Sequence, residues 1–187
     1  MENTFEHSGF TFHCTLVPDT DARAPWLDGD GYGFVSEARL KEHLLKPGER
    51  ILCEDRYSYR AYDWQATIQK AALEGWGLND RDLSKLKATL GRDPKPSEIQ
   101  EVAVQADFDY LKSWCDDEWR YVGLLVTLVK PDGTLDESPE GIIWGVPGND
   151  LEHIRTVAFQ IASELASEFS SELSEVAYWQ ARDVVTL

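Results

Sequence analysis

The 187-residue sequence has few cysteines and no long apolar run, and both shortages exclude classes of protein. The three cysteines, Cys14, Cys53 and Cys115, are odd in number and widely spaced, so they form neither a paired metal-ligand spacing nor a secreted disulfide framework. No apolar stretch approaches the ~20 residues that a membrane helix needs, and the N-terminus lacks the features of a signal peptide. We therefore expect a soluble protein of the cytoplasm, a reducing compartment, that does not bind membranes.

Recognisable catalytic motifs are also lacking. There is no GxSxG, P-loop, GxGxxG or HExxH sequence. Cys14 and His13 are neighbours on a predicted strand and would point to opposite faces, so they cannot act as nucleophile and base. Cys115 with His153 stays open, with no local signature to support it. We expect no catalytic residue, no metal site and no cofactor.

Basic residues are scarce: 18 Lys and Arg stand against 34 Asp and Glu, a net charge of −16. Residues 101–187 hold 17 acidic and 5 basic residues, whereas residues 61–100 are neutral. No segment has the basic excess that direct nucleic-acid binding needs. Acidic residues gathered on one stretch despite their repulsion indicate a basic partner, which could itself bind nucleic acid.

Apolar periodicity and cap residues define the elements that are present. They predict helices over about 64–73, 80–90, 97–114 and 151–173. Strand patterns occupy 10–17, 121–129 and 141–146, with a further short strand within 48–60. The order of these elements predicts an α+β fold. Its antiparallel sheet, an N-terminal strand plus a β-hairpin of the C-terminal half, is packed by three to four helices, including the long C-terminal helix. We expect one domain over residues 1–187, in which residues 18–50 are irregular and loop-rich.

The last predicted helix connects the charge to a shape. Apolar residues recur along it at steps of three and four, and glutamates recur at the same steps on another stripe: Glu164, Glu168, Glu172 and Glu175. Like charges at this spacing destabilise a helix by roughly 0.2–0.5 kcal/mol per pair. They lie ~6 Å apart, comparable to phosphates along a nucleic-acid strand. The stripe predicts either a surface that imitates a phosphate backbone or the solvated face of a highly soluble acidic protein.

A second acidic cluster lies at the end of the helix at 97–114 and consists of Asp107, Asp109, Asp116, Asp117 and Glu118, of which the last three are consecutive. The tryptophans on either side, Trp114 and Trp119, are residues that protein interfaces favour. A hard cation would need further oxygen ligands from other directions, and the cluster has no EF-hand spacing. We predict that Asp116, Asp117 and Glu118 bind a partner; the alternative, which the pattern favours, is simple exposure of acids between two core tryptophans at a helix–strand junction.

Several short aromatic and glycine-containing motifs resemble those of small acidic proteins of unassigned role encoded by bacteriophages and other mobile elements. They are Tyr62-Asp63-Trp64, Gly75-Trp76-Gly77, Asp107-Phe108, Trp114-Cys115, Asp117-Glu118-Trp119, Tyr121-Val122-Gly123, Val126-Thr127-Leu128 and Trp144-Gly145. The resemblance covers most of the chain from about residue 10 onward. It implies the cytoplasm of an infected bacterium and a role in host interaction or counter-defence, without implying an activity.

The leading hypothesis is a non-enzymatic, phage-type accessory protein that binds and inhibits a host or defence protein through its acidic surface. In one version it acts as a nucleic-acid mimic of the anti-CRISPR or anti-restriction type. One alternative is a small metal-dependent or cysteine-based enzyme built around Asp107, Asp116, Asp117 or Cys115. Another is an oligomeric structural phage protein with tryptophan-rich contacts between subunits.

Overall fold

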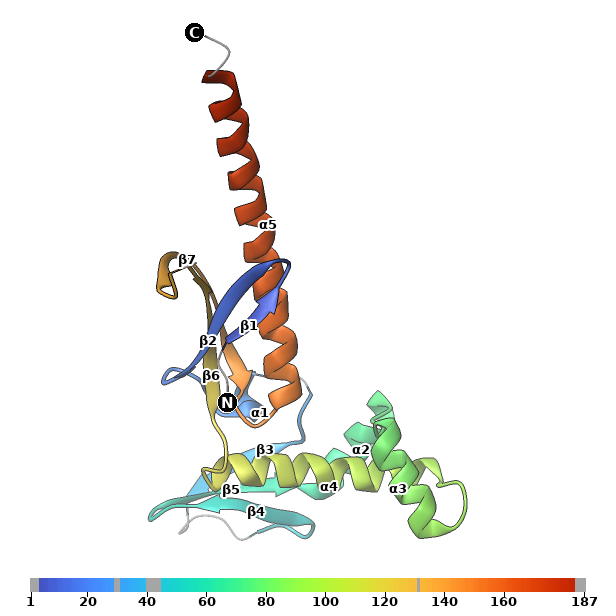
Figure 1. Cartoon of the computed structure of the whole chain (residues 1–187). Helices are drawn as coiled ribbons and strands as arrows, with labels where there is room; N and C mark the ends of the chain where they lie inside the picture. Colours follow the sequence, from blue (N-terminus) through green and yellow to red (C-terminus); the bar gives the residue numbers. More distant parts are fainter. Residues whose placement is uncertain (1–3, 29–30, 40–44, 131, 184–187) are drawn as a thin grey trace. The chain divides into compact units, whose positions relative to one another are not determined.

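The structure is a computed structural model that describes the backbone of residues 4–28, 31–39, 45–130 and 132–183. The chain forms two compact units, whose elements are labelled in Figure 1. The split unit combines residues 1–22 with residues 119–187, and the inserted unit comprises residues 23–118. The sequence predicts one domain over residues 1–187, and the division into two compact units does not test that prediction.

The split unit is built on an antiparallel sheet. In its described part, strands β1 (Thr4–His7), β2 (Phe10–Pro18), β6 (Tyr121–Val129) and β7 (Leu135–Pro147) lie in the order β1-β2-β6-β7. Ser8 and Gly9 connect β1 to β2 with positive φ angles of 51° and 82°. Positive φ at both central residues is what a tight two-residue hairpin requires.

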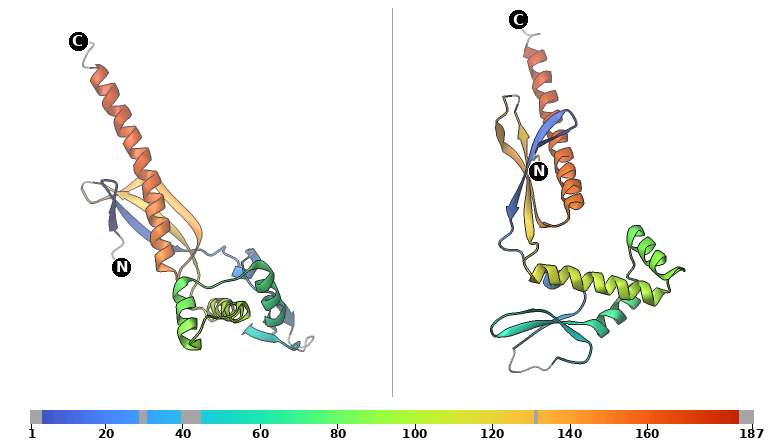
Figure 2. Two further views of the ribbon diagram at one scale, coloured as in Figure 1. Left: turned by 90° about the vertical axis from the view of Figure 1, so that its right-hand side faces the viewer. Right: turned by 60° about the horizontal axis from the view of Figure 1, so that its bottom comes forward.

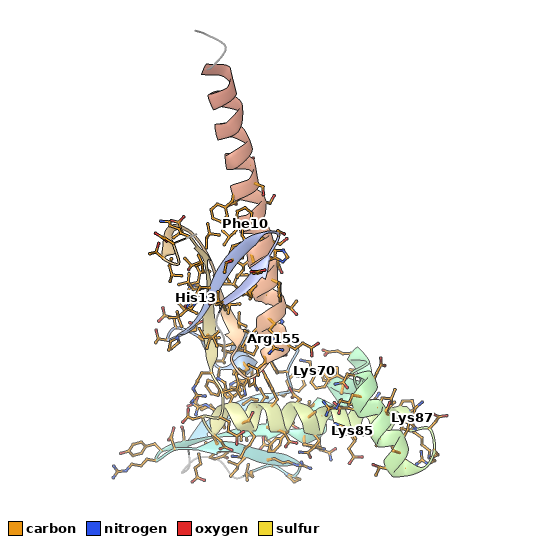
Figure 3. All side chains as sticks on the ribbon, viewed as in Figure 1. Phe10, His13, Lys70, Lys85, Lys87 and Arg155 are labelled. Atoms are coloured by element: carbon orange, nitrogen blue, oxygen red, sulfur yellow. The ribbon has the colours of Figure 1, made fainter. Side chains whose placement is uncertain are left out.

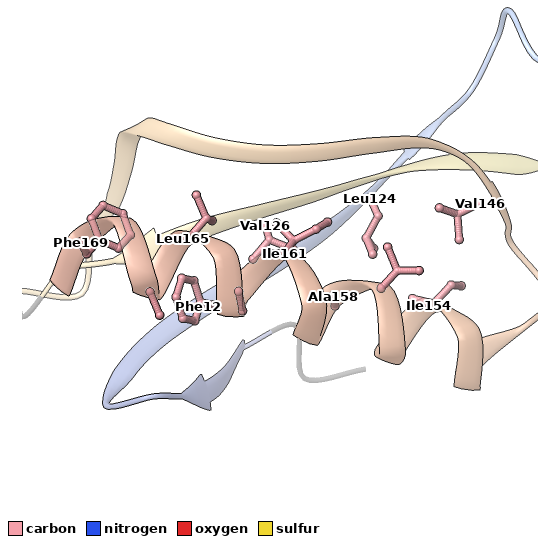
Figure 4. Close-up of a cluster of buried hydrophobic side chains, with 12 residues drawn as sticks. Phe12, Leu124, Val126, Val146, Ile154, Ala158, Ile161, Leu165 and Phe169 are labelled. Carbon is pink, nitrogen blue, oxygen red and sulfur yellow. The ribbon is translucent and has the colours of Figure 1, made fainter. Parts of the chain in front are cut away.

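The first part of helix α5 (Leu151–Asp183) runs along one face of this sheet, and the helix continues beyond the strands, as Figure 2 shows. Asp150 caps its start, because the carboxylate accepts the backbone N–H of His153 at 2.9 Å. The buried face of α5 meets Phe12, Leu124, Val126 and Val146 of the strands (Figure 4). Each large side chain buried in this way contributes about 1.5–3 kcal/mol to folding. This packing fixes which face of α5 is turned away from the sheet.

The chain leaves the split unit and returns to it at the adjoining ends of two paired strands. The register of β2 and β6 continues to Pro18 opposite Val122. Beyond that pair, the backbone N–H of Asp19 donates to the carbonyl of Tyr121 at 3.2 Å. The inserted unit therefore takes the place that a short hairpin turn would have in an uninterrupted sheet.

The inserted unit has its own sheet and its own core. Strands β3 (Val35–Arg39), β5 (Ser58–Asp63) and β4 (Glu49–Glu54) lie antiparallel in the order β3-β5-β4. The helices are α1 (Pro25–Asp28), α2 (Trp64–Glu74), α3 (Asp80–Leu90) and α4 (Pro96–Cys115). Helices α2 and α4 pack on each other and on β4. The buried core consists of Leu52, Tyr62, Trp64, Ala71, Val104 and Leu111.

Local cap chemistry sets the helix ends, as the sequence predicts. The Asp63 carboxylate accepts the Ala66 N–H at 2.9 Å at the start of α2, and Gly75 ends this helix in the left-handed conformation. Asn79 and Gly91 bound α3 in the same way. Helix α4 begins at Pro96 rather than at Ser97, since proline suits the first helical position.

The predicted α+β class with antiparallel strands is confirmed, and the helices expected from periodicity are α2, α3, α4 and α5. The strands are divided between two sheets instead of one. Residues 18–50, expected to be loop-rich, contain α1 and β3, and the short strand expected within 48–60 is β4, which is followed by β5. Among the described residues, no helix has the length and apolarity to cross a membrane.

Candidate functional site

The candidate site is the face of α5 turned away from the sheet. Buried pairs at positions 161–162 and 165–166 alternate with exposed Ser-Glu pairs at 163–164 and 167–168. This alternation follows from 3.6 residues per helical turn with one face held against the sheet. Serine side chains are short, so the glutamate carboxylates reach farthest into solvent. These four exposed residues form what we call the acidic face of α5.

The carboxylates of the acidic face are not neutralised by neighbours. Among the described residues, neither Glu164 nor Glu168 makes an ion pair. Gln160 donates a hydrogen bond to Glu164 at 3.2 Å and leaves its charge in place. Arg155 is the basic residue among the described side chains of α5 (Figure 3). It lies nine residues before Glu164, about 13 Å along the axis, which exceeds the screening length of about 8 Å at physiological salt.

The other two glutamates of the predicted stripe are Glu172 and Glu175. Helix α5 continues through both positions, but their side chains lie outside the described residues. The part of the stripe that the structure describes is therefore Glu164 with Glu168.

The second predicted cluster, Asp116 to Glu118, forms the end of α4. Lys112 Nζ donates to both carboxylate oxygens of Asp116, at 2.5 and 2.6 Å, and this pairing raises the pKa of Lys112. Asp117 has a φ of 60°, and the Glu118 N–H closes the helix onto the carbonyl of Ser113 at 3.0 Å. These residues are exposed, but the charge of Asp116 is already balanced. The contacts of this cluster therefore serve mainly to end helix α4.

The seven predicted binding residues do not lie in one unit. Residues 116–118 belong to the inserted unit, whereas Glu164, Glu168, Glu172 and Glu175 belong to the split unit. Counted by unit, the split unit has 15 acidic and 4 basic residues, a net of −11. The inserted unit has 19 and 14, a net of −5. The acidic excess therefore lies mainly in the unit that carries the acidic face of α5.

Basic side chains of the middle segment are engaged with acids. Lys85, on α3 (Figure 3), pairs with Asp82 at 2.7 Å, and Lys87 pairs with Asp93 at 2.8 Å. Arg92 forms two hydrogen bonds to Glu98, at 2.6 and 2.8 Å. Together with a bond from the Lys95 N–H, this contact lowers the pKa of Glu98 to about 2. Paired cations of this kind offer little attraction for a phosphate backbone.

Asp107, a candidate of the enzyme alternative, holds the segment before β3 in place. One of its carboxylate oxygens accepts the Tyr62 hydroxyl at 2.6 Å and the Gly33 N–H at 2.9 Å. Burial raises the pKa of Asp107 and also that of Tyr62. Nearby, Lys70 Nζ donates to the Tyr32 carbonyl at 2.7 Å. The sequence predicts an irregular, loop-rich segment here but gives no sign of these polar bonds.

An open pocket of about 350 Å³ lies beside Asp107 in the inserted unit. The turn after α2 and one side of α4 line it, with Trp76, Leu78, Asn79, Ala103 and Ala106 among the wall residues. The wall of the pocket contains both polar and apolar residues. One oxygen of Asp107 already accepts hydrogen bonds from Tyr62 and Gly33. Within the described residues no three His, Cys, Asp or Glu side chains converge as metal ligands would.

The cysteine part of the enzyme alternative takes a different form in the structure. Cys115 and His153 belong to different units. The thiol of Cys115 instead lies close to Cys53, a neighbour that sequence spacing does not reveal because 61 residues separate the two.

The chain matches no protein-family model, and comparisons with curated proteins and with solved structures find no significant match.

Proposed function

We propose that the protein is a non-enzymatic accessory protein, of the kind carried by bacteriophages, that binds and inhibits a basic host or defence protein. The acidic face of α5 is the binding surface. The observation that supports this most is that Glu164 and Glu168 have no ion-pair partner among the described residues and lie on a helix whose opposite face is fixed by the core. Their mutual repulsion weakens the helix, so their arrangement favours a role outside the fold.

Two properties suit this face to a basic groove. Its carboxylates repeat at about 6 Å along a straight axis, and the sequence continues the interval through Glu172 and Glu175. The net charge of −11 on the split unit adds a long-range attraction that speeds association with a positive partner. In the version that we favour, the face imitates a run of phosphates and occupies a nucleic-acid-binding groove.

The test is retention of proteins from a bacterial host lysate on the immobilised full chain. We expect basic proteins to bind at ~0.05 M NaCl and to be released at ~0.5 M, because exposed charge pairs are screened by salt. The combined change Glu164→Gln, Glu168→Gln, Glu172→Gln should weaken binding of the captured protein about tenfold or more. Three charge pairs with the partner at roughly 0.5–1 kcal/mol each account for that loss.

The matched control removes three exposed acids from the inserted unit: Glu54→Gln, Glu101→Gln and Asp109→Asn. It changes the net charge by the same amount and should leave the affinity within a factor of about two. Equal losses in both variants would reduce the effect to bulk charge and contradict the proposal. Competition by a DNA duplex tests whether the protein acts as a nucleic-acid mimic. A mimic and DNA should exclude each other from the groove, whereas DNA should not displace a protein that binds elsewhere on the partner.

A further inference from the structure

Two cysteines from distant parts of the chain meet on one face of the inserted unit. Cys53 lies on β4 and is paired across the sheet with Arg60 of β5. Cys115 is the last residue of α4, the helix that packs on β4. Both cysteine residues are half-buried.

The surroundings of the two sulfur atoms differ. Arg60 Nη1 donates to Cys53 Sγ at 3.8 Å, and the Cys115 thiol lies close to the same sulfur. Positive charge and donated hydrogen bonds stabilise a sulfur atom as a thiolate. Cys115 lies at the C-terminal end of α4, where the helix dipole disfavours negative charge. Burial, followed by its contact with Cys53, raises the pKa of Cys115 to about 12.

Charged groups around the pair keep Arg60 in position. Glu37 of β3 is its partner on the other side of β5 and lies 3.7 Å from the guanidinium. Lys112, one turn before Cys115, is held by Asp116. The row Glu37, Arg60, Cys53 thus runs across three strands, with Cys115 beside its end.

From this cluster we infer that Cys53 and Cys115 form a peroxide-reactive dithiol in which Cys53 attacks and Cys115 resolves. The Cys53 thiolate attacks hydrogen peroxide, so that an S–O bond forms, the O–O bond breaks and hydroxide leaves. The Cys115 sulfur, giving up its proton, then attacks the sulfenic sulfur of Cys53. An S–S bond forms, the S–O bond breaks, and the second oxygen leaves as water. In sum, two thiols and one peroxide give one disulfide and two waters.

Treatment of the reduced full chain with hydrogen peroxide tests this inference. The expected product has lost about 2 Da, the mass of two hydrogens, and a peptide map places the disulfide between Cys53 and Cys115. Cys14 lies in the split unit, so the control Cys14→Ser should react at the unchanged rate. A disulfide elsewhere, or none, overturns the inference.

The order of attack has its own test. In Cys115→Ser, dimedone should trap a sulfenic acid on Cys53, whereas Cys53→Ser should give little trapping on Cys115. Arg60→Gln should slow oxidation about tenfold, and Arg60→Lys, which keeps the positive charge, should restore most of the rate. Unchanged tryptophan fluorescence shows that each variant is folded. Preferential trapping on Cys115, or no effect of Arg60→Gln in a folded variant, contradicts the assigned roles.

Discussion

At the scale of single residues, buried polar groups decide where the irregular part of the inserted unit lies. The backbone N–H of Phe34 donates to the Thr67 hydroxyl at 3.1 Å, and that of Gly33 donates to Asp107 at 2.9 Å. At Gly33 an added Cβ would lie 2.5 Å from the Tyr62 ring, so no larger residue fits without displacing this contact. Backbone groups that leave water must find partners, and here side chains of α2 and α4 supply them.

We expect Asp107→Ala to lower the unfolding free energy by about 2–3 kcal/mol, because it removes the acceptor of the Gly33 N–H and leaves the Tyr62 hydroxyl with the more distant Val104 carbonyl at 3.5 Å. Urea unfolding followed by tryptophan fluorescence measures the change. Asp109→Ala is the control on the same helix, since Asp109 is exposed and, within the described part of the chain, accepts a hydrogen bond from Gln105 alone. It should cost no more than about 0.5 kcal/mol. Equal losses in the two variants would show that the buried bonds of Asp107 are not stabilising.

The role of Asp107 could not be read from the sequence. Its partners Tyr62 and Gly33 lie 45 and 74 residues away, and no local pattern reports such a distance. Glu164 and Glu168 are the opposite case. Their exposure follows from the three- and four-residue spacing of the apolar residues around them, and the structure confirms that both are exposed.

At the scale of elements, the contact of α5 with β7 depends on the absence of a side chain. Gly141 lies opposite Val126 on the sheet and faces α5, where an added Cβ would overlap Cγ2 of Ile161. Ile161 is branched at Cβ and has little rotamer freedom to move away. Gly141 therefore sets how closely the helix approaches the sheet, and with it the position of the acidic face.

Gly141→Ala should destabilise the split unit by about 1–3 kcal/mol through overpacking. Ile161→Ala alone should cost about 2–5 kcal/mol by leaving a cavity. Together they should cost less than the sum by at least about 1 kcal/mol, since the new methyl occupies the space that Ile161 vacates. Thermal or urea unfolding of the four proteins gives this coupling.

The control for this cycle is Gly77→Ala, where an added Cβ meets nothing within 4 Å. It should change stability by no more than about 0.5 kcal/mol. Additive losses for Gly141 and Ile161 would mean that the two positions do not share the space between helix and strand.

Elements defined by local signals were predictable, and those defined by pairing were not. The caps at Asp63, Asn79, Gly75 and Gly91 lie within a few residues of the ends that they set. Strand β3, Val-Ser-Glu-Ala-Arg, has little apolar pattern and is defined by its register with β5. Division into two sheets depends on which strands pair across long separations, and single-strand patterns do not contain that information.

At the scale of the whole molecule, the charge follows the units rather than the chain. Residues 101–187 hold the acidic excess in the sequence, but residues 101–118 belong to the inserted unit. The split unit is discontinuous, so no single cut in the sequence separates it. The split unit has a net charge of −11, against −5 in the inserted unit. Most of the repulsion between acidic side chains therefore acts within the split unit.

The two units also have separate cores. The buried cluster around Phe12, Leu124 and Ile161 draws only on the split unit, and that around Tyr62, Trp64 and Val104 only on the inserted unit. We expect each core to support its own unit, since a domain requires a hydrophobic core of its own.

Replacement of residues 22–118 by a two-residue Asn-Gly turn should therefore leave a folded split unit. The ends to be joined are already paired, with Pro18 opposite Val122 and the Asp19 N–H bonded to the Tyr121 carbonyl, and Asn-Gly suits a tight hairpin. Circular dichroism should show helix and strand with a cooperative thermal transition. If the acidic face of α5 is the binding surface, the shortened protein should also retain the salt-sensitive partner of the full chain.

An unfolded product would show that the core around α5 requires the inserted unit. A folded product without binding would instead move the partner site to the inserted unit, where the exposed acids at 116–118 lie.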